Sequence, residues 1–437
     1  MLSVNRHDFG PNFTFGVATA SYQIEGAIGE GRGPSIWDTF AATPGNVKGG
    51  DTGAIADDHY NRWEEDLDLI RDGGFDAYRF SLAWPRLMPE GTGEVNQKGI
   101  DFYDRLIDGM LARNIKPYLT LYHWDLPSAL QDKGGWMNRD IAGWLADYAA
   151  LVAKYYGDRV TAVATINEPW CVAFLSHFLG KHAPGYRDFR AAARAMHHVL
   201  FAHGTAVGAL RANGVKNIGI VTNLQKCEPA SASAEDAAAT ELYDAVHNGW
   251  YLGGLYKGQY PASAVKLFEP YLPQGFEKDM PIVSAPLDWA GINYYSRSLI
   301  AADPESQLPA KAVPGNLELT DIGWEIYPKG LTDLLVRVST DYTKVPIYVT
   351  ENGMAEVEGD EDPRRVKYYD DHLKAVLAAR EAGADVRGYF AWSLMDNFEW
   401  AEGYSKRFGI VGVDYATQKR TPRSSYRAFQ GMLHNTK

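Results

Sequence analysis

The sequence predicts a single-domain (β/α)8 TIM barrel that spans residues 1–437. Three observations lead to this fold class. Short runs rich in β-branched and aromatic residues alternate with longer segments of helical pattern, which is typical of parallel βαβ units. Eight such runs occur, enough to close a barrel. No G-x-G-x-x-G or G-x-x-x-x-G-K-[ST] turn follows an early strand, which disfavours the alternative of an open, doubly wound sheet.

The predicted elements follow one another without a linker, a charge block or a shift in composition. The strands are expected at Phe13–Ala18, Asp76–Ser81, Lys116–Leu121, Thr161–Ile166, Asn217–Thr222, Trp289–Asn293, Pro346–Thr350 and Val386–Trp392. The helices are expected at Trp63–Asp72, Gly99–Asn114, Ala142–Tyr156, Arg190–Asn213, Ala237–Leu252, Pro328–Asp341 and Arg364–Ala382. Barrels of this kind tolerate long loop insertions, so the length of 437 residues is compatible with one domain.

Polar and aromatic side chains gather where the predicted strands end. They are Gln23 and Glu25, Arg79, His123-Trp124, Asn167-Glu168-Pro169, Asn293-Tyr294-Tyr295, Glu351-Asn352-Gly353 and Trp392-Ser393. All strands of a parallel barrel point the same way, so these side chains should meet at its C-terminal face, where the active sites of such barrels lie. The sequence therefore predicts an active site at that face.

Composition excludes several classes of partner. The formal net charge of −12 argues against a nucleic-acid partner, because proteins that bind polyanions concentrate Lys and Arg on one surface. The 12 Trp, 26 Tyr and 17 Phe residues supply flat apolar faces that suit pyranose rings, although core packing accounts for most of them. We expect a small-molecule substrate.

Cysteine content and hydropathy indicate the compartment. Cys171 and Cys227 are too few to cross-link a chain of this length, which fits a reducing environment. The N-terminus lacks a basic segment followed by an apolar one, and no apolar run approaches the roughly 18–20 residues of a membrane span. We therefore expect a cytoplasmic protein without a membrane partner.

Two glutamates directly follow apolar strands. Glu168 lies in TINEPW (residues 165–170) and Glu351 in IYVTENG (residues 347–353), where the glycine suggests a tight turn. Each alone could equally cap a helix, pair with an arginine or initiate a turn. As a pair from strands four and seven they would face each other across one barrel mouth. Glycosidic cleavage requires a carboxylic acid and a carboxylate in such an arrangement.

Arg79 and His123 are further candidates. Arg79 is a charge inside an apolar strand, so it needs an anionic partner; Glu351 is the functional choice and an ordinary buried ion pair the alternative. His123, followed by Trp124, is more plausible as a hydroxyl-binding donor than as a metal ligand. The histidines at 197, 198 and 203 form no His-Glu-x-x-His motif, so we expect no metal and assign them to packing or the surface.

Residues 388–400, GYFAWSLMDNFEW, interleave two tryptophans with two acidic residues at the end of the eighth strand. Core aromatic residues rarely alternate with carboxylates, whereas sugar sites combine an aromatic platform with hydroxyl acceptors. We favour ligand binding over core packing for this segment. The serine-hydrolase alternative fails because no Gly-x-Ser-x-Gly motif is present.

Together these segments resemble glycoside hydrolase family 1, the β-glucosidase family. FTFGVATASYQIEG (residues 13–26) is similar to its N-terminal signature, TINEP to its acid/base motif and YVTENG to its nucleophile motif. The resemblance runs from about Phe13 to Asp414, and several long motifs in the right order are far more specific than a lone Asn-Glu-Pro.

The resemblance implies a retaining β-glucosidase without cofactor or metal that hydrolyses terminal β-D-glucosyl residues through a covalent glycosyl-enzyme. Glu168 would be the acid/base and Glu351 the nucleophile, about 5–5.5 Å apart. Arg79, Asn293 and Tyr295 would support the carboxylates, with Tyr295 bonded to Glu351. The residues implied to bind substrate are Gln23, His123, Trp124, Asn167, Trp324, Trp392, Glu399, Trp400 and Phe408, with Trp392 as the sugar platform and Trp324 on the aglycone side.

Two branches of the family can be weighed. Members that cleave 6-phosphorylated sugars typically carry Ser at the position of Glu399 and Tyr at that of Phe408, so the resemblance favours an unphosphorylated sugar; Lys406 discriminates little. The plant thioglucosidases lack the acid/base glutamate, which is present here as Glu168. A catalytically inactive sugar-binding barrel is disfavoured because both glutamates are present. Transglycosylation, sugar and aglycone preference, and the oligomeric state, a homo-oligomer included, stay open.

Overall fold

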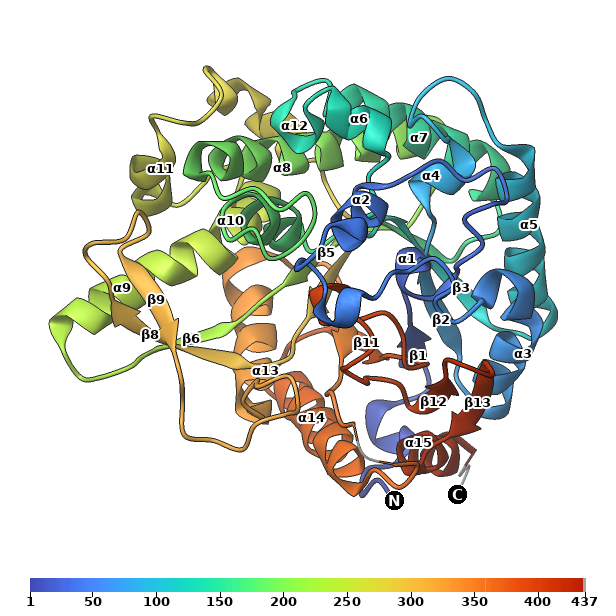
Figure 1. Ribbon diagram of the computed structural model, residues 1–437. Helices are drawn as coiled ribbons and strands as arrows, with labels where there is room; N and C mark the ends of the chain where they lie inside the picture. Colours follow the sequence, from blue (N-terminus) through green and yellow to red (C-terminus); the bar gives the residue numbers. More distant parts are fainter. Residues whose placement is uncertain (358, 435–437) are drawn as a thin grey trace.

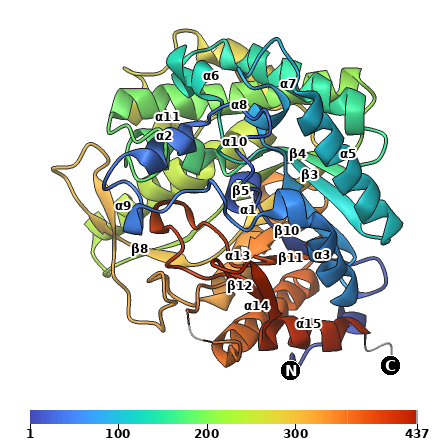
Figure 2. The same ribbon diagram turned by 45° about the vertical axis from the view of Figure 1, so that its right-hand side comes forward.

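The computed structural model describes residues 1–357 and 359–434, and within them eight parallel strands close a barrel in the order β1-β11-β10-β7-β5-β4-β3-β2. Figures 1 and 2 show this barrel at the centre of the molecule, enclosed by helices. The barrel strands are β1 (Thr14–Ala18), β2 (Ala77–Ser81), β3 (Lys116–Tyr122), β4 (Ala162–Asn167), β5 (Ile218–Asn223), β7 (Trp289–Asn293), β10 (Ile347–Asn352) and β11 (Val386–Trp392). The predicted fold class is confirmed.

Helices cover the outer surface of the barrel (Figure 1). The longer ones are α3 (His59–Asp72), α5 (Gln97–Ala112), α7 (Ile141–Tyr156), α8 (Phe189–Ala212), α9 (Ala234–Asp244), α10 (Trp250–Lys257), α13 (Pro328–Arg337), α14 (Pro363–Glu381) and α15 (Ser424–His434). Short helices in the connections are α1 (Ser21–Ile24), α2 (Ile36–Ala42), α4 (Trp84–Leu87), α6 (Ser128–Asp132), α11 (Ala262–Phe268) and α12 (Met280–Val283). Helices cover the outer face of each barrel strand and side chains fill the inner face. Because both faces are buried, the strand sequences are continuous apolar runs.

Aromatic side chains fill the interior of the barrel. The Phe390 ring of β11 lies where a Cβ atom on Gly16 would be 2.4 Å away, so β1 needs glycine at that position. Tyr118 of β3 packs edge-on against Phe390 at a centroid distance of 5.0 Å. This interior is therefore a packed core, and a ligand is expected at the C-terminal face, where the active sites of such barrels lie.

Four barrel strands, β3, β4, β5 and β10, end one or two residues later than predicted. β4 includes Asn167 and β10 includes Glu351 and Asn352, so these polar residues occupy the last strand positions instead of the following loop. Gly353, where a tight turn was predicted, does not have a left-handed backbone conformation. A Cβ atom there would lie 1.8 Å from the carbonyl oxygen of Trp392, so glycine allows the end of β10 to approach the end of β11.

The predicted helix Ala237–Leu252 is wrong as a single element. The chain forms α9, then a π-helical turn at Ala245–Gly249, then α10. Within this turn the Asn248 side chain donates to the Asp244 carboxylate at 2.7 Å and to the Gln225 carbonyl at 2.8 Å. The predicted helix Pro328–Asp341 likewise ends at Arg337 and continues as a π-helical turn, Val338–Tyr342. A π-helical turn holds one residue more than an α-helical turn, and the spacing of apolar residues does not reveal it.

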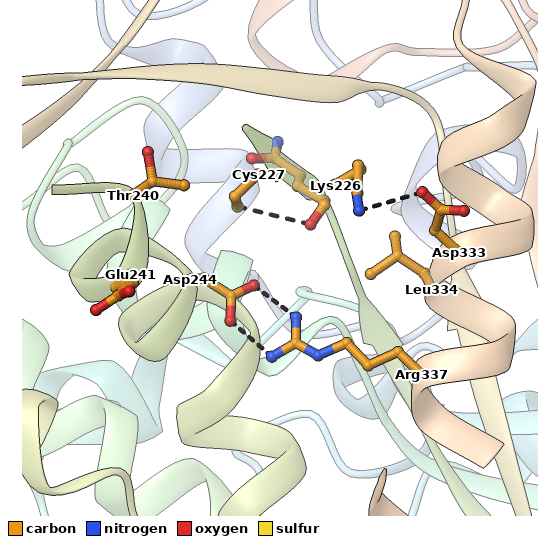
Figure 3. Close-up of a pocket in the computed structure, with 9 residues that line it drawn as sticks. Lys226, Cys227, Thr240, Glu241, Asp244, Asp333, Leu334 and Arg337 are labelled. Atoms are coloured by element: carbon orange, nitrogen blue, oxygen red, sulfur yellow. Dashed lines mark hydrogen bonds and ion pairs between the residues drawn. The ribbon is translucent and has the colours of Figure 1, made fainter. Parts of the chain in front are cut away.

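Two small sheets outside the barrel were not predicted. β6 (Lys226–Pro229), β8 (Arg297–Ala302) and β9 (Ala310–Val313) form one, and β12 (Val411–Asp414) and β13 (Lys419–Pro422) the other. Beside β6 lies a cavity of about 220 Å³, and Figure 3 shows opposite charges paired across it. Arg337 of α13 binds Asp244 of α9 with two bonds of 2.7 Å, and Lys226 lies 3.1 Å from Asp333. These pairs tie α9 and β6 to α13.

Candidate active site

Most of the side chains predicted to meet at the C-terminal face do so, and a buried ion pair lies at their centre. Three do not join them: Glu25 accepts from Arg86 and Tyr103, Tyr294 donates to the Tyr327 carbonyl, and Asn352 bonds to Tyr368 and Tyr389. Arg79, at the end of β2, is 2% exposed, and Glu351, at the end of β10, is 3% exposed. Nη1 of Arg79 donates to Oε1 of Glu351 at 2.6 Å. The Tyr295 hydroxyl donates to Oε2 of the same carboxylate, also at 2.6 Å. The predicted partner of Arg79 is confirmed, as is the bond from Tyr295.

Glu168, which follows β4, has different partners. Its Oε1 accepts from Nδ2 of Asn293 at 2.7 Å, and its Oε2 accepts from Sγ of Cys171 at 3.0 Å. The side chain is buried, and no Lys or Arg in the described part of the chain forms a salt bridge with it. The two glutamates therefore differ in kind: one is bonded to a guanidinium, the other to an amide and a thiol.

These surroundings affect the pKa values of the two carboxyl groups differently. Burial, and then the charge of Glu351, raise the pKa of Glu168 to about 7. Burial also raises the pKa of Glu351, but Arg79 and the hydrogen bond from Tyr295 oppose that rise. Burial keeps the pKa of Tyr295 far above neutrality, so its hydroxyl stays a donor. A cation in direct contact favours an ionised Glu351 beside a protonated Glu168.

A chain of amides fixes the orientation of the groups around the ion pair. The Thr350 hydroxyl donates to Oδ1 of Asn293, which turns Nδ2 of that amide toward Glu168. Nη2 of Arg79 donates to Oδ1 of Asn167, so Nδ2 of Asn167 is the atom that faces Nε2 of His123, 3.0 Å away.

These contacts decide which nitrogen of His123 carries the proton. Burial and the charge of Arg79 lower the pKa of His123, so the ring is neutral. Its Nε2 accepts from Asn167, and the proton therefore lies on Nδ1, which has no partner among the described residues. An unpartnered buried N–H is suited to bind a hydroxyl.

Aromatic side chains form two walls of the site. On one side, Trp400 lies 4.6 Å from Trp124 between ring centroids, and His123 stacks on Trp392 at 6.0 Å. On the other side, Trp324 lies 5.2 Å from Tyr295 and 6.1 Å from Phe408. Trp392 and Trp400 are buried, whereas Trp324 is 36% exposed and marks the outer rim.

Like Nδ1 of His123, Oε1 of Gln23 and Oε2 of Glu399 are buried atoms that lack a partner within the described residues. Nε2 of Gln23 is held by Oδ1 of Asn397 and by the carbonyl of Phe398, each at 2.9 Å. A buried acceptor without a partner is costly, so these oxygens are suited to ligand hydroxyls.

Glu399 is not a fixed negative charge that would by itself repel a 6-phosphate group. Burial, together with Glu351 and Glu168, raises its pKa to about 8, so the carboxyl is largely neutral at pH 7. The ammonium group of Lys406 donates to the backbone carbonyl of Asp321. A 6-phosphate group would therefore be disfavoured mainly because its charge would lose water without gaining a cationic partner among the described residues. Repulsion by Glu399 would contribute less.

Three residues of the site have left-handed backbone conformations, which only glycine adopts without strain. They are Trp124 with φ 81°, Glu168 with φ 52° and Trp400 with φ 50°. Each such residue costs on the order of 1–3 kcal/mol and persists only where its surroundings enforce it. The packing around the site therefore holds these three residues in strained conformations.

Sequence reasoning missed several groups at the same face. Cys171 is three residues after Glu168, a spacing at which helical neighbours touch. Asn223 ends β5 as Asn293 ends β7, and its buried Oδ1 has no partner in the described chain. The strand-end rule could have found Asn223. His182, which packs on Trp124 at 5.2 Å, has no local sequence signal.

The histidines of α8 have packing roles. His197 bonds to Asp279 and to the Tyr260 hydroxyl, each at 2.9 Å, and His203 bonds to Thr165 at 2.6 Å. In residues 1–357 and 359–434, no three His, Cys, Asp or Glu side chains are arranged to hold a metal ion. Over the same residues, no helix is long and apolar enough to cross a membrane.

Comparisons with known proteins agree on one family. The chain is 47% identical to β-glucosidase A of Thermotoga maritima, with 99% of both chains covered. It is 48% identical to a 1,4-β-D-glucan glucohydrolase of Thermotoga neapolitana, with 98% of each covered. Its structure superposes with a TM-score of 0.95 on the family 1 β-glucosidase of Thermotoga maritima in complex with isofagomine lactam, at 48% identity over 98% of both chains.

The family model for glycosyl hydrolase family 1 matches residues 5–437, nearly the whole chain. The match covers both glutamates, the arginine that pairs with Glu351, and the aromatic walls. With identities near one half over almost the full length of its relatives, the chain belongs to glycosyl hydrolase family 1.

Proposed function

We propose that this chain is a retaining β-glucosidase, with Glu351 as nucleophile and Glu168 as acid/base. The observation that carries the proposal is the inequality of the two buried glutamates. Glu351 is bonded to a guanidinium and a phenol. Glu168 forms no salt bridge within the described residues, and burial raises its pKa to about 7. One carboxylate that is held ionised beside one that is held protonated is the requirement for the first step of retaining hydrolysis.

The reaction proceeds in two displacements. A carboxylate oxygen of Glu351 attacks the anomeric carbon, and the bond to the leaving oxygen breaks as Glu168 transfers its proton to that oxygen. Glu168, now a carboxylate, removes a proton from water, whose oxygen attacks the same carbon and releases Glu351. Two inversions give net retention. Arg79 and Tyr295 stabilise the Glu351 carboxylate before the first step and after the second.

The donors and acceptors of the site suit a neutral hexose. Glu399, Gln23 and His123 offer unpartnered polar atoms beside Trp392, which would lie under the sugar ring. Trp324 and Phe408, at the rim, would contact the aglycone. The relatives carry the names β-glucosidase and 1,4-β-D-glucan glucohydrolase, which supports β-glucosides and short β-glucans as substrates and a role in cellulose degradation.

The proposal assigns the whole chain, residues 1–437, to one catalytic barrel domain. It places the enzyme in the cytoplasm. Two free cysteines, one buried and one partly buried, support a reducing compartment.

A panel of nitrophenyl glycosides tests the proposed function. We expect the β-glucoside to be hydrolysed, the α-glucoside to be inert, and the β-glucoside 6-phosphate to react at least about 10²-fold more slowly in kcat/KM. A phosphate brings a charge of roughly −1.5 to −2 at pH 7 into a site whose one central cation is already paired. Proton NMR should show the β-anomer of glucose first. Initial release of the α-anomer, or equal use of the 6-phosphate, would contradict the proposal.

The pH profile of kcat/KM should be bell-shaped, because Glu351 must be ionised while Glu168 is protonated. Activity should fall as pH rises through the pKa of Glu168, near 7 in the free enzyme. Glu351→Gln removes a neighbouring charge and should lower the pKa of Glu168 by about one unit, or roughly 1.4 kcal/mol. Carbon-13 NMR of glutamate-labelled enzyme measures this, with Glu168→Gln to assign the signal. An unchanged pKa would show that the two carboxyls do not share a site.

A further inference from the structure

Cys171 contacts the carboxyl that the proposed function makes the acid/base. It is the first residue of a π-helical turn, Cys171–Leu175, that follows β4, and it is buried. Its Sγ lies 3.0 Å from Oε2 of Glu168, the oxygen opposite the one that Asn293 binds. Among the described side chains, Cys171 is the hydrogen-bond partner of that oxygen.

The chemistry of the two partners decides where Glu168 carries its proton. The Asn293 amide nitrogen can only donate, and the bond from Thr350 to Oδ1 keeps it turned toward Glu168. Oε1 therefore stays an acceptor in both ionisation states, and the proton belongs on Oε2, beside the thiol. A thiol is a weak donor and a weak acceptor, so it can donate to the carboxylate yet compete little for the proton of the acid.

We propose that Cys171 is a positioning residue for the reaction: its thiol orients Oε2 of Glu168 and bonds it weakly enough for the proton to be exchanged with substrate and water. This inference rests on the proposed role of Glu168. A hydroxyl in the same place would hold the carboxylate more strongly, and an aliphatic side chain would not hold it at all.

Other charged and titratable groups also act on Glu168. They are Glu351 from β10, Arg79 from β2, Tyr295 after β7 and Glu399 after β11. Burial and Glu351 raise the pKa of Glu168, whereas Asn293, Cys171 and Arg79 lower it. A substitution at position 171 leaves the others in place, so the change in the pH profile reports on the thiol.

The test compares Cys171→Ser, Cys171→Val and Cys171→Ala, with Cys227→Ser as control because Cys227 lines the cavity outside the barrel. Thiol donation stabilises the ionised form of Glu168, so its loss raises the pKa and keeps the acid protonated to higher pH. The alkaline limb of the kcat/KM profile should shift to higher pH by about half a pH unit in the Val and Ala variants. It should shift to lower pH by about as much in the Ser variant. Cys227→Ser should keep the wild-type profile.

Val enlarges and Ala shrinks the side chain, so a common upward shift excludes packing as its cause. An alkaline limb that does not move in any Cys171 variant, or that moves the same way in Ser as in Val, would overturn the proposal even if activity falls. Glu168→Gln separates this failure from failure of the proposed function. If the alkaline limb persists in Glu168→Gln, Glu168 is not the acid and the proposed function is wrong. If the limb vanishes in Glu168→Gln but does not move in the Cys171 variants, only the role of Cys171 is wrong.

Discussion

Glu351→Gly should lower kcat for a nitrophenyl β-glucoside by about 10⁴-fold or more, because no other group can form the glycosyl-enzyme. The same change leaves the buried Arg79 without its anion, which costs about 3–5 kcal/mol of folding stability. Thermal unfolding therefore has to accompany the kinetics. Glu381→Gly is a suitable control, since Glu381 is exposed at the end of α14, next to the start of the barrel strands.

Azide should restore turnover of Glu351→Gly. The anion fits the space that the carboxylate leaves and faces the Arg79 guanidinium, so it attacks the anomeric carbon from the nucleophile side. The β-glucoside then gives α-glucosyl azide, which proton NMR identifies from the anomeric coupling. A folded variant that azide does not rescue, or that yields the β-azide, would contradict Glu351 as nucleophile.

Glu168→Ala should separate substrates by their leaving groups. Without a proton donor, glycosylation by alkyl or cellobiose-type substrates should slow by roughly 10²–10⁴-fold. Dinitrophenyl glucoside, whose leaving group needs no proton, should still react quickly and accumulate the glycosyl-enzyme. A pre-steady-state burst of dinitrophenolate measures this accumulation.

Azide should accelerate turnover of this variant and give the β-glucosyl azide, because it attacks the intermediate from the face that Glu168 served. The azides from the two variants thus have opposite anomeric configurations. If the anomers were interchanged, the roles of Glu168 and Glu351 would have to be exchanged. If all leaving groups slowed equally, Glu168 would act in binding and not in proton transfer.

Much of the fold was predictable because strand and helix periods are local properties of the chain. Eight apolar runs placed every end of the barrel strands to within two residues. The errors lie where a tertiary contact overrides the period. The π-helical turn at Ala245–Gly249 is stabilised by a bond from Asn248 to the distant Gln225 carbonyl. β8 pairs with β6 although four α-helices and strand β7 lie between them in the sequence.

The sequence by itself determined that Glu168, Glu351 and Arg79 belong to one site, because parallel strands bring their carboxyl ends to a single face and a buried arginine needs an anion. Only the tertiary structure decided how they are bonded. Arg79 and Glu351 are 272 residues apart, and Asn293 and Glu168 are 125 apart, so no local pattern encodes which amide faces which oxygen. Burial and neighbouring charge, which raise the pKa of Glu168 to about 7 and that of Glu399 to about 8, likewise arise only when distant strands exclude water together.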